Sequence, residues 1–325
     1  MIIESKSLKC NISSNNSYFT NFALDMYDNF NKAKFNEEFT TPFVETANII
    51  YSAFSQKGKI IKENIDEKRF NDNGTILLAF SGGLDSVYQA LRLKETGKKV
   101  VLFHVKNMNF YTNGQEYKAA KIFAEYKNFD FVEASVTPTK NSEYKKVWKE
   151  NPTKNELFFC MMLDYMLENG GNKFSSGDDL NLTLKNAVPD TNLSDAKEVT
   201  LSFMNEIKGV EFIPTSKVNK ADRIKYLAEN NCLDYYYSCV TAGRLVRYLH
   251  DKAEQKFNIK LDYWDCGAAC RKCAFHSLLK HYYLEEEFPD EYINKCWDTI
   301  SKGADNVFFD KSIPLEQRIK NLIEY

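Results

Sequence analysis

Short apolar runs alternate with amphipathic segments through the middle of the chain. The apolar runs predict buried strands at TILLAF (75–80), KKVVLFHV (98–105), FDFVEASV (129–136), NKFSSG (172–177) and VEFIP (210–214). The amphipathic segments predict helices at 85–97, 116–127, 156–169 and 220–231. Strands separated by helices predict an α/β fold with a doubly wound, mainly parallel sheet.

The two ends of the chain have a different pattern. Residues 1–72 are rich in Asn, Lys, Glu and aromatics, with a weakly helical patch at FVETANIIYSAF (43–54), and their role is unknown. After residue 234 the alternation stops and a cysteine cluster begins a smaller, helix-rich part. We therefore expect an N-terminal extension (1–72), an α/β domain (73–234) and a metal-binding helical part (235–325).

Composition narrows the function classes. The 325 residues carry a formal net charge of −2, which gives no bulk attraction to nucleic acid. The N-terminus has no basic segment followed by an apolar one, and no apolar run reaches the ~18 residues that span a bilayer. We expect a cytoplasmic protein with no membrane partner, in which the eight cysteines bind metal or lie buried.

A loop rich in glycine and hydroxyl groups follows the first predicted strand. It reads SGGLDS, from Ser81 to Ser86, and a helix begins within it. Amide groups at a Gly-rich turn that opens a helix form an anion site, and glycines let a phosphate approach closely. The loop is neither a Walker A motif nor GxGxxG nor GxSxG. A tight turn with Asp85 or Ser86 as helix cap is the alternative.

The string SGGLDS resembles the SGGxDS signature of the N-type ATP pyrophosphatase (PP-loop) family, whose fold is adenine nucleotide alpha hydrolase-like. The resemblance implies that ATP is cleaved between the α and β phosphates and that a substrate oxygen is adenylylated. Ser81, Ser86 and the loop amides would hold the pyrophosphate, and Asp85 would orient the site or its Mg²⁺. The implied nucleotide-binding segment is Phe80, Ser81, Gly82, Gly83, Leu84, Asp85 and Ser86.

Further segments resemble 7-cyano-7-deazaguanine synthase (QueC), in that family's order. They are PTKNELFF (152–159), the PD-containing run 188–207, VNKADRI (218–224), YYSCV (236–240) and the cysteine cluster. Lys154 stands where the family has arginine, and the resemblance implies a catalytic role for it and nucleotide contacts for Asn155 and Lys220. The chain departs from the family in its N-terminal extension, its tail after 280 and an inserted helical segment at 243–257.

Three cysteines lie within eight residues in DCGAACRKC. Cys266, Cys270 and Cys273, with Cys239 upstream, supply four thiolates for a tetrahedral Zn²⁺ at Zn–S distances near ~2.3 Å. A redox pair is the alternative use of two neighbouring cysteines, and His250, His276 and His281 are substitute ligands. Four sulfurs leave zinc no open position, so we expect a structural site. Burial explains the remaining cysteines, which are Cys10, Cys160, Cys232 and Cys296.

Other residues follow predicted strands at the edge where α/β sheets bind ligands. His104 lies near the end of the second strand, and Gly177, Asp178 and Asp179 follow the fourth. A carboxylate there would hold Mg²⁺ or a base edge, whereas the alternatives are a core histidine and a solvated loop or helix cap. We assign His104, Gly177 and Asp178 to the nucleotide site, together with Lys220.

The resemblance implies an ATP- and Mg²⁺-dependent carbon–nitrogen ligase that adenylylates 7-carboxy-7-deazaguanine. Ammonia would then give the amide, and a second ATP-dependent step the nitrile of the queuosine pathway. Three alternatives remain: a QueC-like protein of phage or antiviral systems that transfers the deazaguanine to an amine on a protein or into a nucleic-acid pathway, an RNA-thiolating PP-loop enzyme, and a nucleotide sensor without catalysis. A homodimer is compatible with each of them.

Overall fold

The structure is a computed structural model of the chain. It describes residues 1–5, 8–35, 70–107, 114–139, 154–177, 207, 209–215, 218–239, 241, 243–301, 313–314 and 317–320, with only the backbone at 26–27, 29–35, 154–156 and 244. Contacts divide the chain into two units. The sheet unit is Met1–Phe80, Arg92–Met108 and Phe129–Thr215, and the helical unit is Ser81–Leu91, Asn109–Asn128 and Ser216–Tyr325.

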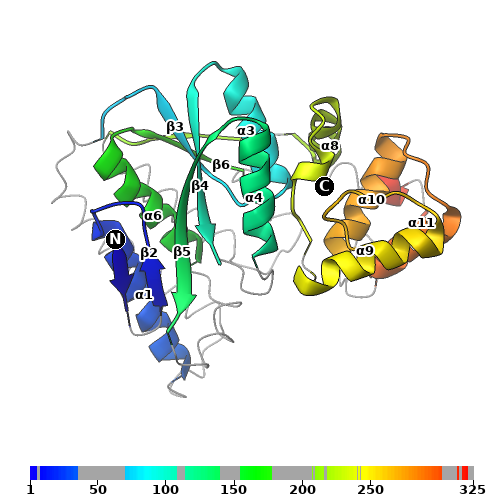
Figure 1. Cartoon of the computed structure of the whole chain (residues 1–325), viewed down its shortest axis with the longest axis horizontal. Coiled ribbons are helices and arrows are strands. Elements are labelled where there is room, and N and C mark those ends of the chain that lie inside the picture. Colours follow the sequence, from blue (N-terminus) through cyan, green and yellow to red (C-terminus); the bar gives the residue numbers. More distant parts are fainter. Residues whose placement is uncertain are drawn as a thin grey trace. The chain divides into compact units, whose positions relative to one another are not determined.

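A seven-stranded sheet with the order β1-β2-β5-β4-β3-β6-β7 organises the sheet unit (Figure 1). Its parallel part consists of β3 (Thr75–Ala79), β4 (Lys99–Lys106), β5 (Asp130–Pro138), β6 (Lys173–Ser176) and β7 (Glu211–Ile213). Leu78 lies opposite Leu102 and Ser175 across the central strand pairs, and Leu78 and Leu102 are fully buried. The predicted α/β class with a mainly parallel sheet is therefore confirmed, since β3, β4, β5, β6 and β7 pair in parallel.

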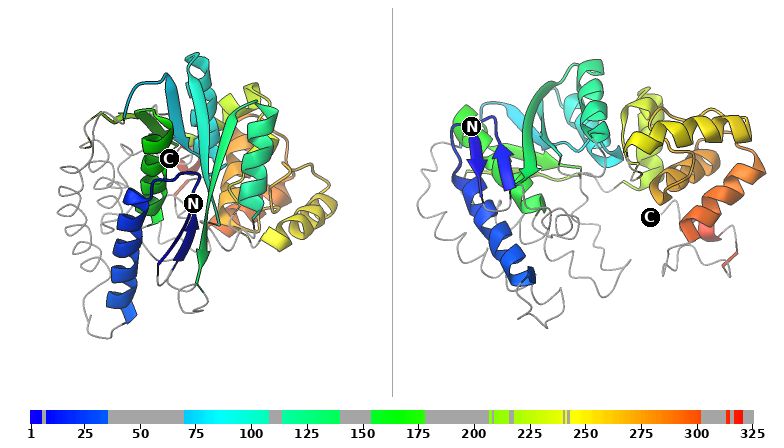
Figure 2. Two further views of the ribbon diagram at one scale, coloured as in Figure 1. Left: turned by 60° about the vertical axis from the view of Figure 1, so that its left-hand side comes forward. Right: turned by 60° about the horizontal axis from the view of Figure 1, so that its bottom comes forward.

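The N-terminal segment belongs to this sheet, which the sequence pattern did not predict. Strand β1 (Ile2–Glu4) pairs with β2 (Leu8–Asn11), and β2 pairs with β5, both antiparallel. Helix α1 (Tyr18–Phe35) packs against α6 (Lys154–Asn169), and Figure 2 shows the blue and green helices side by side in the left view. Residues 1–35 thus extend the α/β unit, although the role of the extension stays open.

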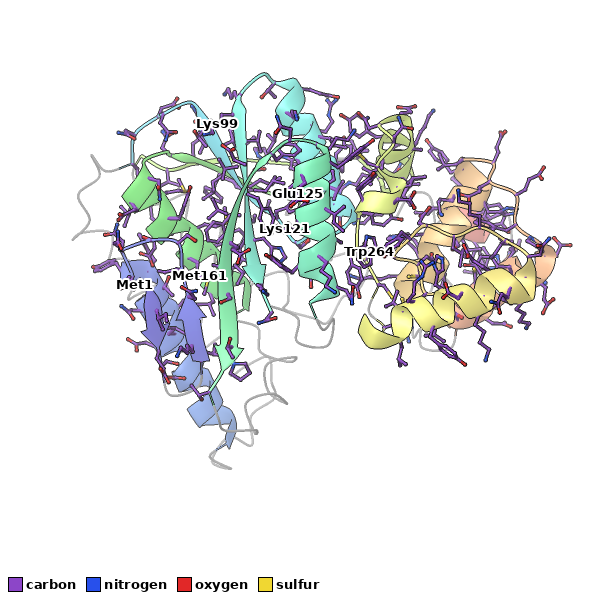
Figure 3. The ribbon with its side chains drawn as sticks, in the orientation of Figure 1. Met1, Lys99, Lys121, Glu125, Met161 and Trp264 are labelled. Carbon is purple, nitrogen blue, oxygen red and sulfur yellow. The ribbon has the colours of Figure 1, made fainter. Side chains whose placement is uncertain are left out.

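A buried carboxylate of α6 holds the start of α1. Asp164 accepts hydrogen bonds from the backbone N–H of Phe19 (3.0 Å) and of Thr20 (2.7 Å), and from the Thr20 hydroxyl (2.6 Å). The first N–H groups of a helix have no intrahelical partner, so a carboxylate there both caps the helix and offsets its dipole. Met161, labelled in Figure 3, is fully buried on the same helix α6.

The helical unit contains the part of the chain that follows the sheet. Its described helices include α4 (Gln115–Tyr126), α8 (Lys220–Glu229), the 3-10 turn η4 (Leu233–Tyr235), α9 (Gly243–Phe257), α10 (Arg271–Tyr283) and α11 (Asp290–Ser301). The predicted helices at 116–127 and 220–231 correspond to α4 and α8, and the helical segment 243–257 forms α9. In the part of the chain that the structure describes, no helix is long and apolar enough to cross a membrane.

Helix α3 (Leu84–Glu95) begins directly after the SGGLDS loop. Phe80 ends the strand segment: its N–H donates to the carbonyl of Phe103 at 2.8 Å, and its side chain is fully buried. The chain thus passes from a buried strand through the loop into a helix, as the pattern predicts. The patch FVETANIIYSAF and the run 188–206 lie outside the described residues.

Candidate functional site

The SGGLDS loop presents backbone amides at the start of α3. Intrahelical hydrogen bonding begins with the N–H of Val87, which donates to the carbonyl of Gly83 at 2.9 Å. The amides of Leu84, Asp85 and Ser86 lie before that bond and are therefore outside the helical pattern. Leu84 N–H lies 3.4 Å from the hydroxyl of Ser238, a long contact. The loop therefore has the geometry that binds anions at helix N-termini.

The hydroxyl groups of Ser81 and Ser86 form hydrogen bonds within the loop. Ser81 Oγ lies 3.2 Å from Ser86 Oγ and accepts a 3.3 Å hydrogen bond from Gly83 N–H, while Ser86 Oγ donates to the Gly83 carbonyl at 3.0 Å. Tyr237 N–H donates to the carbonyl of Gly82 at 2.7 Å. The segment that leads into Cys239 is thus hydrogen-bonded to the loop, and it brings Ser238 beside the first turn of α3.

Glycine suits positions 82 and 83 for different structural reasons. Gly82 has a φ of +79°, and a Cβ there would lie 3.1 Å from Cβ of Ala120 on α4. Gly83 has no such backbone strain, and its missing side chain would meet Ser81 Oγ at 3.3 Å. Gly82 is therefore required by the fold of the loop, whereas Gly83 keeps space open at the hydroxyl groups.

Asp85 forms ion pairs with two basic side chains of helix α8. Its Oδ1 lies 2.5 Å from Lys220 Nζ and 2.6 Å from Arg223 Nη1. Burial raises the pKa of the Asp85 carboxyl, but the charges and hydrogen bonds of Lys220 and Arg223 more than offset this, so the pKa lies below its usual value. The carboxylate is ionised at neutral pH, and the three groups together leave one net positive charge beside the loop.

The sequence analysis named Lys220 but missed Arg223 and Ser238. The side chain of Arg223 is 1% exposed, whereas that of Lys220 is 26% exposed. Arg223 follows Lys220 by three residues, so both side chains lie on one side of α8. That spacing was the available signal, but only the fold reveals that they share Asp85 as a partner.

The remaining predicted nucleotide residues belong to the sheet unit. His104 is buried, its Nδ1 lies 2.8 Å from the Phe80 carbonyl, and burial lowers its pKa to about 4. Its observed contacts are those of a core histidine, and its contact with nucleotide stays a prediction. Gly177 follows β6, and Lys154 and Asn155 lie in the first turn of α6. Asp178 and Asp179 lie outside the described residues.

The four clustered cysteines come together in the helical unit. The Sγ atoms of Cys239, Cys266, Cys270 and Cys273 all lie within 4.8 Å of one another and are buried. Those of Cys239 and Cys270 are 3.8 Å apart. Four ligands at ~2.3 Å from a tetrahedral zinc are about 3.8 Å from each other, whereas a disulfide needs a separation of about 2.05 Å. The donor set therefore fits one tetrahedral ion.

Helices α9 and α11 hold the turn that carries these cysteines. A Cβ at Gly267 would lie 2.1 Å from Cβ of Ala253 on α9, so only glycine fits there. From α11, Lys295 Nζ donates to the Gly267 carbonyl at 2.5 Å and Thr299 Oγ1 to the Ala268 carbonyl at 2.9 Å. Helix α9 is therefore part of the support of the cysteine cluster.

The cysteine cluster is enclosed by side chains. Trp264, labelled in Figure 3, packs in one buried cluster with Tyr237, Val246 and the four cysteines. The cavity that borders Cys239 and Cys273 has a volume of about 10 Å³, which holds one water molecule at most. A closed set of four sulfurs is typical of a structural site.

Hydrogen bonds among the four cysteines shift the pKa values of their thiols in opposite directions. Hydrogen bonding with Cys239 lowers the pKa of Cys270 and raises those of Cys266 and Cys273, and hydrogen bonding with Cys266 lowers the pKa of Cys239. The substitute histidines have other partners: His250 Nδ1 lies 3.0 Å from the Asp265 carbonyl, His276 Nδ1 3.2 Å from the Tyr236 hydroxyl, and His281 Nδ1 2.8 Å from the Glu286 carbonyl. We therefore assign the site to the four cysteines. All eight cysteines are buried, and none forms a disulfide.

Comparison with known proteins finds similar solved structures but no matching family. No protein-family model matches the sequence, and no curated protein is similar to it. A solved structure of a predicted subunit of tRNA methyltransferase from Methanocaldococcus jannaschii is similar with a TM-score of 0.28 and 17% identity, over 43% of this chain and 66% of that one, just under two thirds. The U34-tRNA thiolase NcsA from Methanococcus maripaludis, with its [4Fe-4S] cluster, is similar with a TM-score of 0.37 and 18% identity, over 63% of this chain and 74% of that one.

Proposed function

We propose that the protein is a PP-loop ATP pyrophosphatase that adenylylates a carboxylate and passes the acyl group to an amine. The observation that carries the proposal is the arrangement at Asp85. A glycine-rich helix start supplies amides and two hydroxyl groups, and two cations from α8 lie beside it with one net positive charge. This set of groups suits a triphosphate, and no Walker lysine is present in the loop to favour transfer of the γ-phosphoryl group.

The chemistry follows from which phosphates the loop would hold. An oxygen of the substrate carboxylate attacks the α-phosphorus, and the bond from that phosphorus to the bridging oxygen breaks. Pyrophosphate leaves with the electron pair, so charge develops on the group next to the loop. The amides of Asp85 and Ser86, the hydroxyl of Ser81 and the ammonium of Lys220 are placed to stabilise that charge. Mg²⁺ bound to ATP would neutralise the phosphates further.

The second step needs an amine. Its nitrogen attacks the carbonyl carbon of the acyl adenylate, AMP leaves, and loss of a proton gives the amide. The resemblance to QueC supports 7-carboxy-7-deazaguanine as the carboxylate and ammonia as the amine, with a second round of activation for the nitrile. Asp85 forms ion pairs with Lys220 and Arg223, so we assign it the role of holding these two side chains in place. We assign the zinc site a structural role, which is to stabilise the fold.

Three other functions predict different outcomes. RNA thiolation through a persulfide needs a reactive cysteine, and the burial of all eight cysteines argues against that route. A nucleotide sensor would bind ATP without releasing pyrophosphate. A protein amine in place of ammonia would give a covalent conjugate.

The test is product analysis of the purified full chain with ATP, Mg²⁺, 7-carboxy-7-deazaguanine and ammonia. We expect AMP and pyrophosphate in equal amounts, with the amide or nitrile of the deazaguanine in the mass spectrum. Release of ADP and orthophosphate would contradict the proposal. Reactions without the carboxylate or without ammonia separate the activation step from the amide-forming step. For the variant Lys220→Met, the matched control is Lys225→Met, which changes an exposed lysine on the same helix α8.

A further inference from the structure

Arg223 occupies an unusual place for a charged residue. Its side chain is 1% exposed, and its guanidinium makes contacts on several sides. Nη1 lies 2.6 Å from Asp85 Oδ1, Nε donates to the Val218 carbonyl at 3.0 Å, and the group lies over the ring of Tyr88 at 5.5 Å. A buried charge held by an ion pair, a carbonyl and an aromatic face has little freedom to move.

Lys220 shares the same oxygen of Asp85 but not the same confinement. Its Nζ lies 2.5 Å from Asp85 Oδ1, and its side chain is 26% exposed. It is the first residue of α8, after Asn219, whose side chain caps the helix by accepting from Asp222 N–H at 2.8 Å. The cap fixes the backbone at Lys220, while its four-carbon side chain can change partner.

One carboxylate oxygen therefore has two cations of unequal mobility. Arg223 alone is enough to neutralise Asp85, so the departure of Lys220 would not leave a buried charge unpaired. An anion at the start of α3 could form an ion pair with Lys220 at small electrostatic cost, because Asp85 would still be paired with the buried Arg223.

We propose that Arg223 is a positioning residue that holds Asp85, so that Lys220 exchanges this carboxylate for a phosphate oxygen when nucleotide or pyrophosphate binds. The inference rests on the proposed function, since it names how that site takes up its anion. Arg223 acts through Asp85 and Lys220 and does not contact the phosphates itself.

The test is a double-mutant cycle on the affinity for inorganic pyrophosphate with Mg²⁺, measured by calorimetry on the full chain. Lys220→Met should raise the Kd by about tenfold to a hundredfold, as expected for loss of one charged hydrogen bond. Arg223→Lys keeps the charge but lacks the fork that reaches both Asp85 and Val218, and it should raise the Kd by about tenfold. The double variant should bind no more weakly than Lys220→Met alone, because Arg223 acts only through Lys220.

The matched control is Arg247→Lys, which changes an exposed arginine that pairs with Asp251 at 3.2 Å on α9, and it should leave the Kd unchanged. A merely structural Arg223 would instead give additive losses, or an unchanged affinity in Arg223→Lys, and either result overturns the inference. Melting curves of each variant exclude unfolding as the cause, and Arg223→Lys retains the buried positive charge for that reason. If the wild-type protein binds neither pyrophosphate nor ATP, the proposed function fails together with the inference.

Discussion

The cysteine cluster gives the prediction with the largest expected effect. Replacing Cys270 with serine removes one of four sulfurs that lie within 4.8 Å of one another. The serine hydroxyl still offers an acceptor for the N–H of Cys273 at the start of α10, so the change tests the metal ligand and leaves the helix cap in place. Binding of structural zinc contributes roughly 10–16 kcal/mol in small zinc domains, which equals or exceeds the ~5–15 kcal/mol stability of a typical domain. We therefore expect Cys270→Ser to lose the metal and to unfold the region of α9, α10 and α11.

The assay combines elemental analysis with circular dichroism. Freshly purified wild-type protein should contain about one zinc per chain, and a strong chelator should lower its helix content in parallel with the metal that is released. Cys296→Ala is the matched control, because Cys296 is fully buried on α11 but lies outside the cluster. That variant should keep its zinc and lose only about 1–2 kcal/mol of stability.

Several results would refute the reasoning. A folded wild-type protein without metal would show that the four thiols only pack together. Four irons per chain with broad visible absorbance would indicate a cluster, whose cysteine sulfurs must lie farther apart because each binds a different iron. Full zinc content in Cys239→Ser would show that another group is the fourth ligand.

Three further predictions concern the loop and the sheet unit. Gly82→Ala should cost about 1–2 kcal/mol in a denaturant titration because of its φ of +79°, whereas Gly83→Val should keep the fold and weaken ATP binding; equal stability losses would contradict this. The pKa of His104 is about 4 in the folded protein, below the ~6.5 of the unfolded chain. Its contribution to stability is therefore complete above pH 6.5 and falls by about 3 kcal/mol as the pH drops to 4. His104→Asn should flatten the pH profile of the melting temperature between these two pH values. Asp164→Asn replaces one carboxylate oxygen by an NH₂ group that faces donors at the start of α1, so thermal unfolding should show a loss of about 1–3 kcal/mol, and an unchanged melting temperature would show that this cap is dispensable.

The sequence predicted the centre of the parallel sheet because β3 and β4 are buried on both faces. TILLAF and KKVVLFHV are continuous apolar runs, and such runs leave few alternatives once helices separate them. The strands β1 (IIE) and β2 (LKCN) have only three and four residues, which is too short for an alternating pattern to stand out. Their place at the edge of the sheet depends on pairing with β5, more than a hundred residues away in the chain.

In the candidate site, too, residues close together in the sequence could be predicted, whereas residues whose partners are distant in the sequence could not. The grouping of Cys266, Cys270 and Cys273 was evident because metal ligands from one turn have a short, characteristic spacing. Arg223 was missed because its partner Asp85 lies 138 residues earlier, and Ser238 because the amide that it contacts, at Leu84, lies 154 residues earlier. Ordinary charged and hydroxyl residues have no spacing signal, so only the fold identifies them as parts of the site.

The position of Asp85 changes how its charge is understood. A carboxylate in the first turn of α3 is stabilised by the helix dipole, but the same charge repels a phosphate at that helix start. Taken alone, Asp85 would therefore weaken the anion site that its neighbours form. With Lys220 and Arg223 on one of its oxygens, the repulsion is reversed, and the carboxylate fixes two cations where an anion would arrive. Asp85→Asn should consequently weaken pyrophosphate binding although it removes a negative charge, and tighter binding in that variant would show that the two cations do not depend on Asp85.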